Sequence, residues 1–139
     1  MKEVIAVSAC LLGYNCKYNG NNNLNPKIVD YLIDKIVLPI CPEKLGGLTT
    51  PRIPSEIQTD GRILNANGQD VTNCFLRGQL LTYETMKQHQ AKKVILKDGS
   101  PSCGYTYVYD GSFTNTRMHG MGVTAKYLLQ NGVTILDWQ

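Results

Sequence analysis

The sequence predicts an α/β fold, a single three-layer domain over residues 1–139 with a mostly parallel sheet. Short apolar stretches alternate along the chain with stretches whose apolar residues recur at helical spacing. This alternation is typical of parallel strands that are joined by crossover helices. The chain is long enough for one domain with a substantial core, and no internal repeat or linker divides it.

Five short stretches are the expected strands, because they are rich in β-branched, leucine or aromatic residues. They cover residues 4–7, 37–40, 94–96, 107–109 and 133–136. A hairpin is also expected near Asp60-Gly61, because Asp-Gly is a favoured pair in tight β-turns.

Three stretches have the apolar spacing of helices, and they cover residues 26–36, 70–89 and 122–130. Pro26 suits the first turn of the first helix, and Gly132 suits the position that stops the last one. The segments 13–26 and 42–54 are rich in Asn, Gly and Pro, so we expect loops there.

Composition and charge exclude several classes of protein. The formal net charge is +3 and the basic residues are scattered, which does not favour nucleic-acid binding. No apolar run is long enough to cross a bilayer, so no membrane partner is expected. The short apolar stretch at the N-terminus indicates a first strand rather than a signal peptide, which predicts a cytoplasmic protein. The sequence carries no signal for the oligomeric state.

Five cysteines in a reducing compartment suggest metal binding or catalysis rather than disulfides. Cys10, Cys41 and Cys103 each follow an expected strand, and ligands of parallel sheets bind beyond the carboxyl ends of the strands. We therefore expect the three thiols to gather at one edge of the sheet. Pro and Gly next to Cys41 and Cys103 indicate loops whose backbone amides can point at sulfur.

The other two cysteines have different surroundings. Cys16 lies in the long loop, where it is a fourth ligand, an active-site thiol or a plain loop residue. Cys74 lies inside an expected helix beside Phe75, which indicates core packing.

The donor set favours a 4Fe–4S cluster over zinc. Zinc prefers four protein ligands in a structural site, or His and carboxylate in a catalytic one. Only His89 and His119 are present. His89 is expected on the surface, and His119 is expected as a plain loop residue, with a place in the lining of the site as the alternative. A cluster with three cysteine ligands leaves one iron open to a substrate.

Several motifs in this chain, taken together and in this order, are specific. They are Ser8-Ala9-Cys10-Leu11-Leu12-Gly13, Cys16-Lys17-Tyr18-Asn19-Gly20, Cys41-Pro42-Glu43, Pro51-Arg52-Ile53-Pro54-Ser55-Glu56 and Ser100-Pro101-Ser102-Cys103-Gly104. With them the sequence resembles, over nearly its whole length, a family long labelled as of unknown function that includes bacterial thiouracil desulfidases.

The resemblance implies a 4Fe–4S cluster held by Cys10, Cys41 and Cys103. The open iron would take the sulfur of a small thiolated substrate such as thiouracil, which leaves as hydrosulfide. Glu43 matches the acid/base carboxylate of the family. The alternative is that Glu43 is an exposed carboxylate in a loop, without a catalytic role. Either Ser100 or Ser102 matches a catalytic hydroxyl.

Arg52 has two interpretations. Its guanidinium either holds a substrate group or pairs with Glu56. The sequence departs from the family motif near Cys16, where Lys17 replaces an arginine and Asn19 an aspartate, so the substrate can differ.

Three other functions compete with a desulfidase. A zinc-binding structural module would use all four thiols at Cys10, Cys16, Cys41 and Cys103. A cluster for electron transfer would need Cys16 as a fourth ligand. A thiol-redox protein is disfavoured, because the sequence has no Cys-x-x-Cys pair.

Overall fold

The computed structural model describes residues 2–138, and its centre is a four-stranded parallel sheet. The strands are β1 (Val4–Ser8), β2 (Ile36–Ile40), β5 (Lys93–Ile95) and β8 (Thr134–Leu136), in the order β2-β1-β5-β8. Ala6 pairs with Leu38 on one side and with Val94 on the other. The predicted α/β class with a mostly parallel sheet is confirmed.

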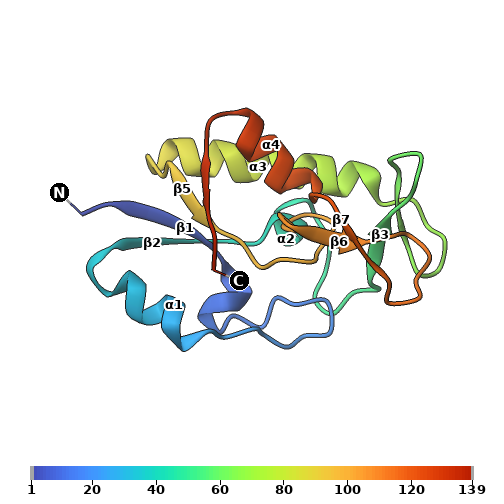
Figure 1. Cartoon of the computed structure of the whole chain (residues 1–139), viewed down its shortest axis with the longest axis horizontal. Helices are drawn as coiled ribbons and strands as arrows, with labels where there is room; N and C mark the ends of the chain where they lie inside the picture. Colours follow the sequence, from blue (N-terminus) through green and yellow to red (C-terminus); the bar gives the residue numbers. More distant parts are fainter. Residues whose placement is uncertain (1, 139) are drawn as a thin grey trace.

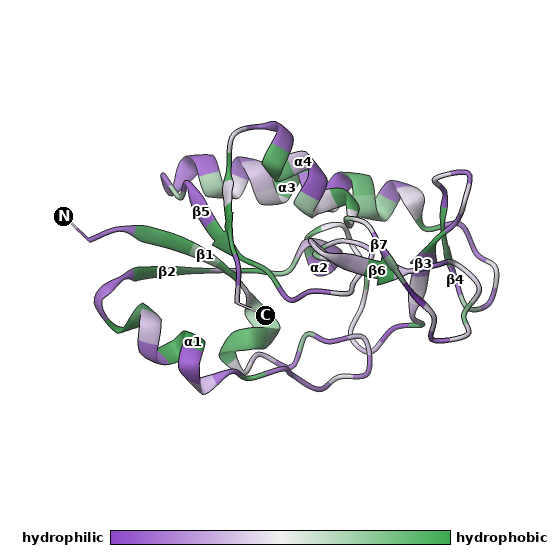
Figure 2. Ribbon diagram, viewed as in Figure 1, coloured by the Kyte–Doolittle hydropathy of each residue, from purple (hydrophilic) through white to green (hydrophobic). Residues whose placement is uncertain are grey.

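Helices cover both faces of this sheet (Figure 1). The helices α3 (Thr72–Gln88) and α4 (Val123–Gln130) lie on one face, and α1 (Pro26–Tyr31) lies on the other. Alternate residues of β1 divide between two core clusters: Ala6 belongs to the α3–α4 side, while Ile5 and Val7 pack with Ile28 of α1. Figure 2 shows the apolar colouring of these strands between the helices.

Two antiparallel hairpins lie outside the central sheet. The first joins β3 (Ser55–Ile57) to β4 (Ile63–Asn65), as the Asp60-Gly61 pair predicts. The second joins β6 (Tyr107–Tyr109) to β7 (Arg117–His119). Figure 1 shows β6, β7 and β3 on the same side of the molecule, beyond the ends of β1 and β2.

The structure corrects three expectations about local elements. The helix after Pro26 ends at Tyr31 and continues only as a 3₁₀ turn (Leu32–Asp34), because the chain must turn back so that β2 can pair with β1. The segment 42–54 holds a short helix, α2 (Pro42–Leu45). His119 lies in β7 rather than in a loop, and it is exposed and does not line the cavity of the cysteines.

The helix α2 packs closely on α3 because two glycines remove side chains from their contact. A Cβ at Gly46 would lie 1.9 Å from the carbonyl oxygen of Cys74, and one at Gly78 would lie 2.1 Å from that of Pro42. This close approach fixes the turn that follows β2. None of the helices within residues 2–138 has both the length and the apolar character needed to span a bilayer. The expectation of one domain over residues 1–139 stays a prediction.

Candidate active site

The three strand-end cysteines line one cavity at the carboxyl edge of the sheet. Cys41 follows β2 directly, Cys10 lies in a 3₁₀ turn (Ala9–Leu12) after β1, and Cys103 lies in the loop after β5. Because β2, β1 and β5 are neighbours, their loops open into the same cavity of about 580 Å³. The structure therefore brings these thiols together, as the strand pattern predicts.

Hydrogen-bond donors surround two of these sulfurs. The amide of Asn23 donates to Sγ of Cys10 at 3.4 Å. The hydroxyl of Ser8 donates to Sγ of Cys103 at 3.6 Å, and Oγ of Ser102 lies 3.7 Å from the same sulfur. Such donors orient a sulfur ligand and favour its thiolate form. Ser8 and Asn23 were not among the predicted site residues.

Cys16 is buried and lines the same cavity as Cys10 and Cys41. A hydrogen bond from the Cys16 thiol lowers the pKa of Cys10 to about 7 and that of Cys41 to about 6, against the opposing effect of burial. The same hydrogen bonds raise the pKa of Cys16. Cys10 and Cys41 are therefore the sulfurs that most readily become thiolates.

Cys103 and Cys74 differ from these thiols. Burial raises the pKa of Cys103 to about 12, although Ser8 donates to its sulfur. A bound metal deprotonates such a thiol outright. Cys74 is half-buried on α3 and is not part of the cavity wall.

A carboxylate and two hydroxyls form a chain beside the thiols. Oγ of Ser102 donates to Oε2 of Glu43 at 2.8 Å and lies 3.1 Å from Oγ of Ser100. Oγ of Ser100 also accepts from the backbone N–H of Cys103 at 2.7 Å. Since the hydroxyl proton of Ser102 points at Glu43, Ser100 is the donor within the serine pair. Ser102 is thus the hydroxyl in direct contact with the carboxylate.

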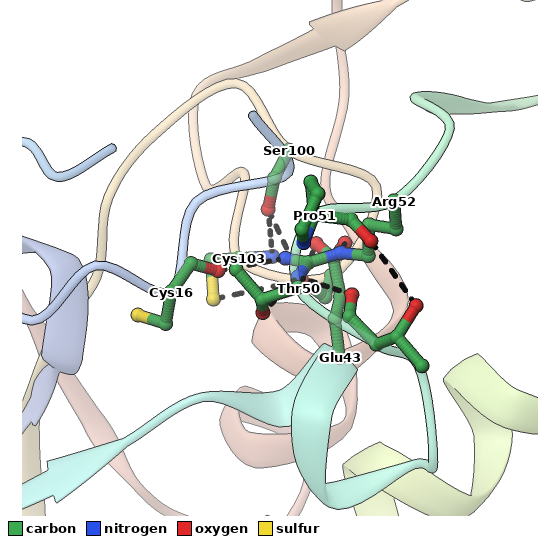
Figure 3. Close-up of polar contacts among 9 residues, drawn as sticks. Cys16, Glu43, Thr50, Pro51, Arg52, Ser100 and Cys103 are labelled. Atoms are coloured by element: carbon green, nitrogen blue, oxygen red, sulfur yellow. Dashed lines mark hydrogen bonds and ion pairs between the residues drawn. The ribbon is translucent and has the colours of Figure 1, made fainter. Parts of the chain in front are cut away.

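Arg52 holds Glu43 from the other side (Figure 3). Its Nε donates to Oε1 of Glu43 at 3.1 Å, and both side chains are largely buried. Its other nitrogens donate to the carbonyls of Thr49 and Cys16 and to the hydroxyl of Thr50, at 3.0–3.1 Å. The expected pairing of Arg52 with Glu56 is wrong, because the chain path of residues 44–51 brings Arg52 back to the start of α2.

Asp98 organises the loop that carries Cys103, although the sequence analysis gave it no role. It is 2% exposed and accepts from the backbone N–H groups of Gly99, Tyr105, Thr106 and Tyr107. The hydroxyl of Thr106 also donates to it. Burial would raise the pKa of Asp98, but these hydrogen bonds outweigh it and hold the pKa below its usual value. The sequence feature that could have indicated this role is the position of Asp98 shortly after an apolar strand and directly before Gly99.

The thiols are not arranged for a single metal ion. Within residues 2–138, no three His, Cys, Asp or Glu side chains converge closely enough to hold one ion. Ligands of a four-iron cluster stand farther apart, because the cluster itself fills the space between them. Three cysteines around an open cavity, with donors to their sulfurs, fit that chemistry.

Comparison with known proteins agrees with this donor set. A family model described as 2-thiouracil desulfurase matches residues 5–138. The chain belongs to the 2-thiouracil desulfurase family. It is also similar to an uncharacterized protein, YbbK, from Bacillus subtilis (strain 168), with 39% identity over 143 residues, which cover 96% of this chain and 95% of that protein.

A solved structure resembles this member of the 2-thiouracil desulfurase family closely. It is that of the 4Fe–4S-dependent thiouracil desulfidase TudS, with a TM-score of 0.90 and 38% sequence identity. The match covers 97% of this chain and 90% of that one. The likeness therefore extends over the sheet, the helices and the loops that form the cavity.

Proposed function

We propose that this protein removes sulfur from a small thiolated compound such as thiouracil and releases hydrosulfide, with a 4Fe–4S cluster bound by Cys10, Cys41 and Cys103. One observation carries the proposal: in a member of the 2-thiouracil desulfurase family, three strand-end thiols and a Glu43–Ser102 pair line the same cavity. The reducing cytoplasm is the compartment in which such thiols stay available to iron.

The reaction exchanges sulfur for oxygen without oxidation or reduction. Water adds its oxygen to the thiolated carbon and the C–S bond breaks. One proton of water leaves on hydrosulfide and the other passes to solvent, because the product carries as many hydrogens as the substrate. When bound, a cluster with three thiolate ligands offers one iron to the substrate sulfur and makes sulfur a better leaving group. No electron donor enters this balance.

Glu43 and Ser102 supply the proton transfers. Glu43 accepts the hydrogen bond of Ser102 at Oε2, next to the open cavity, and a carboxylate in that place can take a proton from the attacking water. Ser102 is 1% exposed and bonded to Glu43, so its hydroxyl is held in one orientation. We assign the catalytic hydroxyl to Ser102, while Ser100 holds the turn by accepting from Cys103.

We infer that Arg52 holds Glu43 rather than the substrate. Four hydrogen bonds to the protein occupy its guanidinium, and one of them ties the carbonyl of Cys16 to the same group. A guanidinium that is hydrogen-bonded in this way fixes the Glu43 carboxylate in place. Arg52 therefore links the loop of Cys16 to the acid/base pair.

A cluster for electron transfer is the second candidate, and the position of Cys16 favours it. Cys16 lines the cavity beside Cys10 and Cys41, where a fourth thiolate would complete the ligand set and close the open iron. The two functions differ in whether Cys16 is needed for the cluster. A Cys16→Ser variant that keeps the cluster and releases sulfide from thiouracil supports the desulfidase.

The decisive experiment is anaerobic reconstitution with iron and sulfide, followed by addition of 2-thiouracil. The expected result is a brown protein with about four irons per chain that forms uracil and sulfide in equal amounts. Cys41→Ser is expected to lose the cluster, while the matched control Cys74→Ser keeps it, because Cys74 lies outside the cavity wall. Tight zinc binding without iron uptake would instead support the structural module.

A further inference from the structure

The tip of the β6–β7 hairpin forms part of the wall of the cavity that the thiols line. Phe113 and Asn115, within the tip at residues 110–116, line the cavity together with Tyr107 and Tyr109 of β6. The rings of the two tyrosines meet edge to face, with centroids 6.0 Å apart. This part of the wall carries aromatic rings, whereas the thiols, Glu43 and Ser102 make another part of the cavity polar.

Glu56 of β3 holds this tip through its backbone. Oε1 of Glu56 accepts from the N–H of Gly111 at 2.9 Å and from the N–H of Phe113 at 3.1 Å. The amide of Gln58 adds a bond to the carbonyl of Gly111 at 3.1 Å. A Cβ at Gly111 would lie 2.7 Å from the carbonyl oxygen of Ile57, so the tip packs directly against the first hairpin.

The tip needs this support because Phe113 has an unfavourable backbone conformation. Its φ of 58° lies in the left-handed region that bulky side chains avoid, whereas Asn115, with φ of 60°, is a residue type that tolerates this region. Such conformations persist when the surroundings hold them in place. For Phe113, the hydrogen bond from its own backbone N–H to Glu56 is the contact that stabilises this conformation most directly.

We propose that Glu56 is a positioning residue that fixes Phe113, and that the ring of Phe113 forms the wall against which the planar ring of the substrate stacks. This inference rests on the proposed function for the identity of the substrate. Glu56 acts through the backbone of Gly111 and Phe113 and needs no contact with the substrate itself. Aromatic rings in the wall of the cavity that holds the thiols select flat, aromatic thiolated compounds over thiolated aliphatic ones.

The test compares Glu56→Ala, Phe113→Ala and the double variant, with Glu84→Ala as the control for loss of an exposed carboxylate. Each is reconstituted anaerobically, and kcat and KM for 2-thiouracil are measured beside uracil affinity by calorimetry. Loss of the stacked ring is expected to raise KM and the Kd for uracil about tenfold. Cluster content and kcat stay unchanged, and Glu56→Gln, which keeps an acceptor oxygen, restores wild-type values.

The double variant separates positioning from general stability. If Glu56 acts through Phe113, the double variant has the same Kd for uracil as Phe113→Ala alone. Limited trypsin cleavage after Arg117, followed on cluster-free protein, is expected to be faster in Glu56→Ala than in Glu84→Ala. Additive effects on Kd, or unchanged cleavage, overturn the proposal.

Failure of the proposed function has a different signature. If the wild-type protein releases no sulfide but binds uracil, and binding depends on Glu56 and Phe113, the wall stands while the desulfidase reaction falls. If it releases sulfide with a KM that neither variant changes, the reaction stands and the wall falls. A protein that neither releases sulfide nor binds uracil overturns both.

Discussion

Replacing Asp98 by asparagine tests whether one buried carboxylate holds the loop that carries Cys103. The carboxylate accepts from four backbone N–H groups and from the hydroxyl of Thr106. Hydrogen bonds to a charged group contribute roughly 1.5–3 kcal/mol each, and a buried donor left unpaired costs about 1–3 kcal/mol. All four N–H groups bond to Oδ1 and the hydroxyl of Thr106 bonds to Oδ2. The asparagine side chain removes the charge that strengthens these hydrogen bonds and places an N–H₂ group against the hydroxyl of Thr106.

We expect Asp98→Asn to lower the free energy of unfolding by about 2–4 kcal/mol, which is roughly 10 °C in Tm for a chain of this size. The matched control is Asp60→Asn, because the side chain of Asp60 is 53% exposed where it pairs with Arg62. That change is expected to leave the free energy of unfolding nearly unchanged, because solvent screens an exposed ion pair. The measurement is urea unfolding of cluster-free protein under anaerobic, reducing conditions.

The pH dependence gives a second readout of the same carboxylate. The pKa of Asp98 is lower in the folded protein than in the unfolded chain, so folding favours its ionised form. Its contribution to stability is complete above the unfolded pKa of about 4 and is lost as the pH falls through the folded value. Asp98→Asn is expected to lose this part of the acid dependence. Equal stability of the Asp98 and Asp60 variants, or an unchanged acid dependence, would refute the reasoning.

Two further predictions concern the thiols and the arginine. In cluster-free protein at pH 7.5 we expect iodoacetamide to label Cys41 at least about tenfold faster than Cys103, because the pKa of Cys41 is about 6 and that of Cys103 about 12. Peptide mass spectrometry measures the two labelling rates. Equal rates would contradict the difference in pKa between the two thiols. Arg52→Gln is expected to keep the cluster and to lower kcat about 10–100-fold with KM within about twofold, because Glu43 loses its partner. A raised KM with unchanged kcat would show instead that Arg52 binds substrate.

The sequence predicts the thiols better than their hydrogen-bond partners, for a physical reason. Cys10, Cys41 and Cys103 follow apolar strands, and a parallel sheet aligns the ends of its strands whatever the loops do. The ion-pair partner of Arg52 depends on how residues 44–51 fold. Glu56 is closer to Arg52 in the sequence, but the path of these residues brings Arg52 to Glu43. The role of Asp98 was not predicted, because its hydrogen-bond donors lie in an irregular turn, and a turn leaves no periodic pattern in the sequence.

The hairpin tip shows the same limit at longer range. The sequence indicates a strand at residues 107–109, but β7 is too short and too exposed to leave a pattern. Glu56 contacts two residues of the tip, Gly111 and Phe113, which follow it in the sequence by 55 and 57 positions. Such a contact follows only from the packed arrangement of two hairpins, and therefore the wall of the cavity could not be predicted.

The proposed acid/base groups, Glu43 and Ser102, share two turns with the thiols of Cys41 and Cys103, and this couples them. Glu43 is two residues from Cys41, and Ser102 is next to Cys103, while the bond between Glu43 and Ser102 closes the path from one turn to the other. Any group that fixes the two thiols therefore also sets the distance between the carboxylate and the hydroxyl. Arg52 ties the loop of Cys16 to the same carboxylate. We infer that binding of a ligand by the thiols also aligns the proposed proton-transfer pair, Glu43 and Ser102.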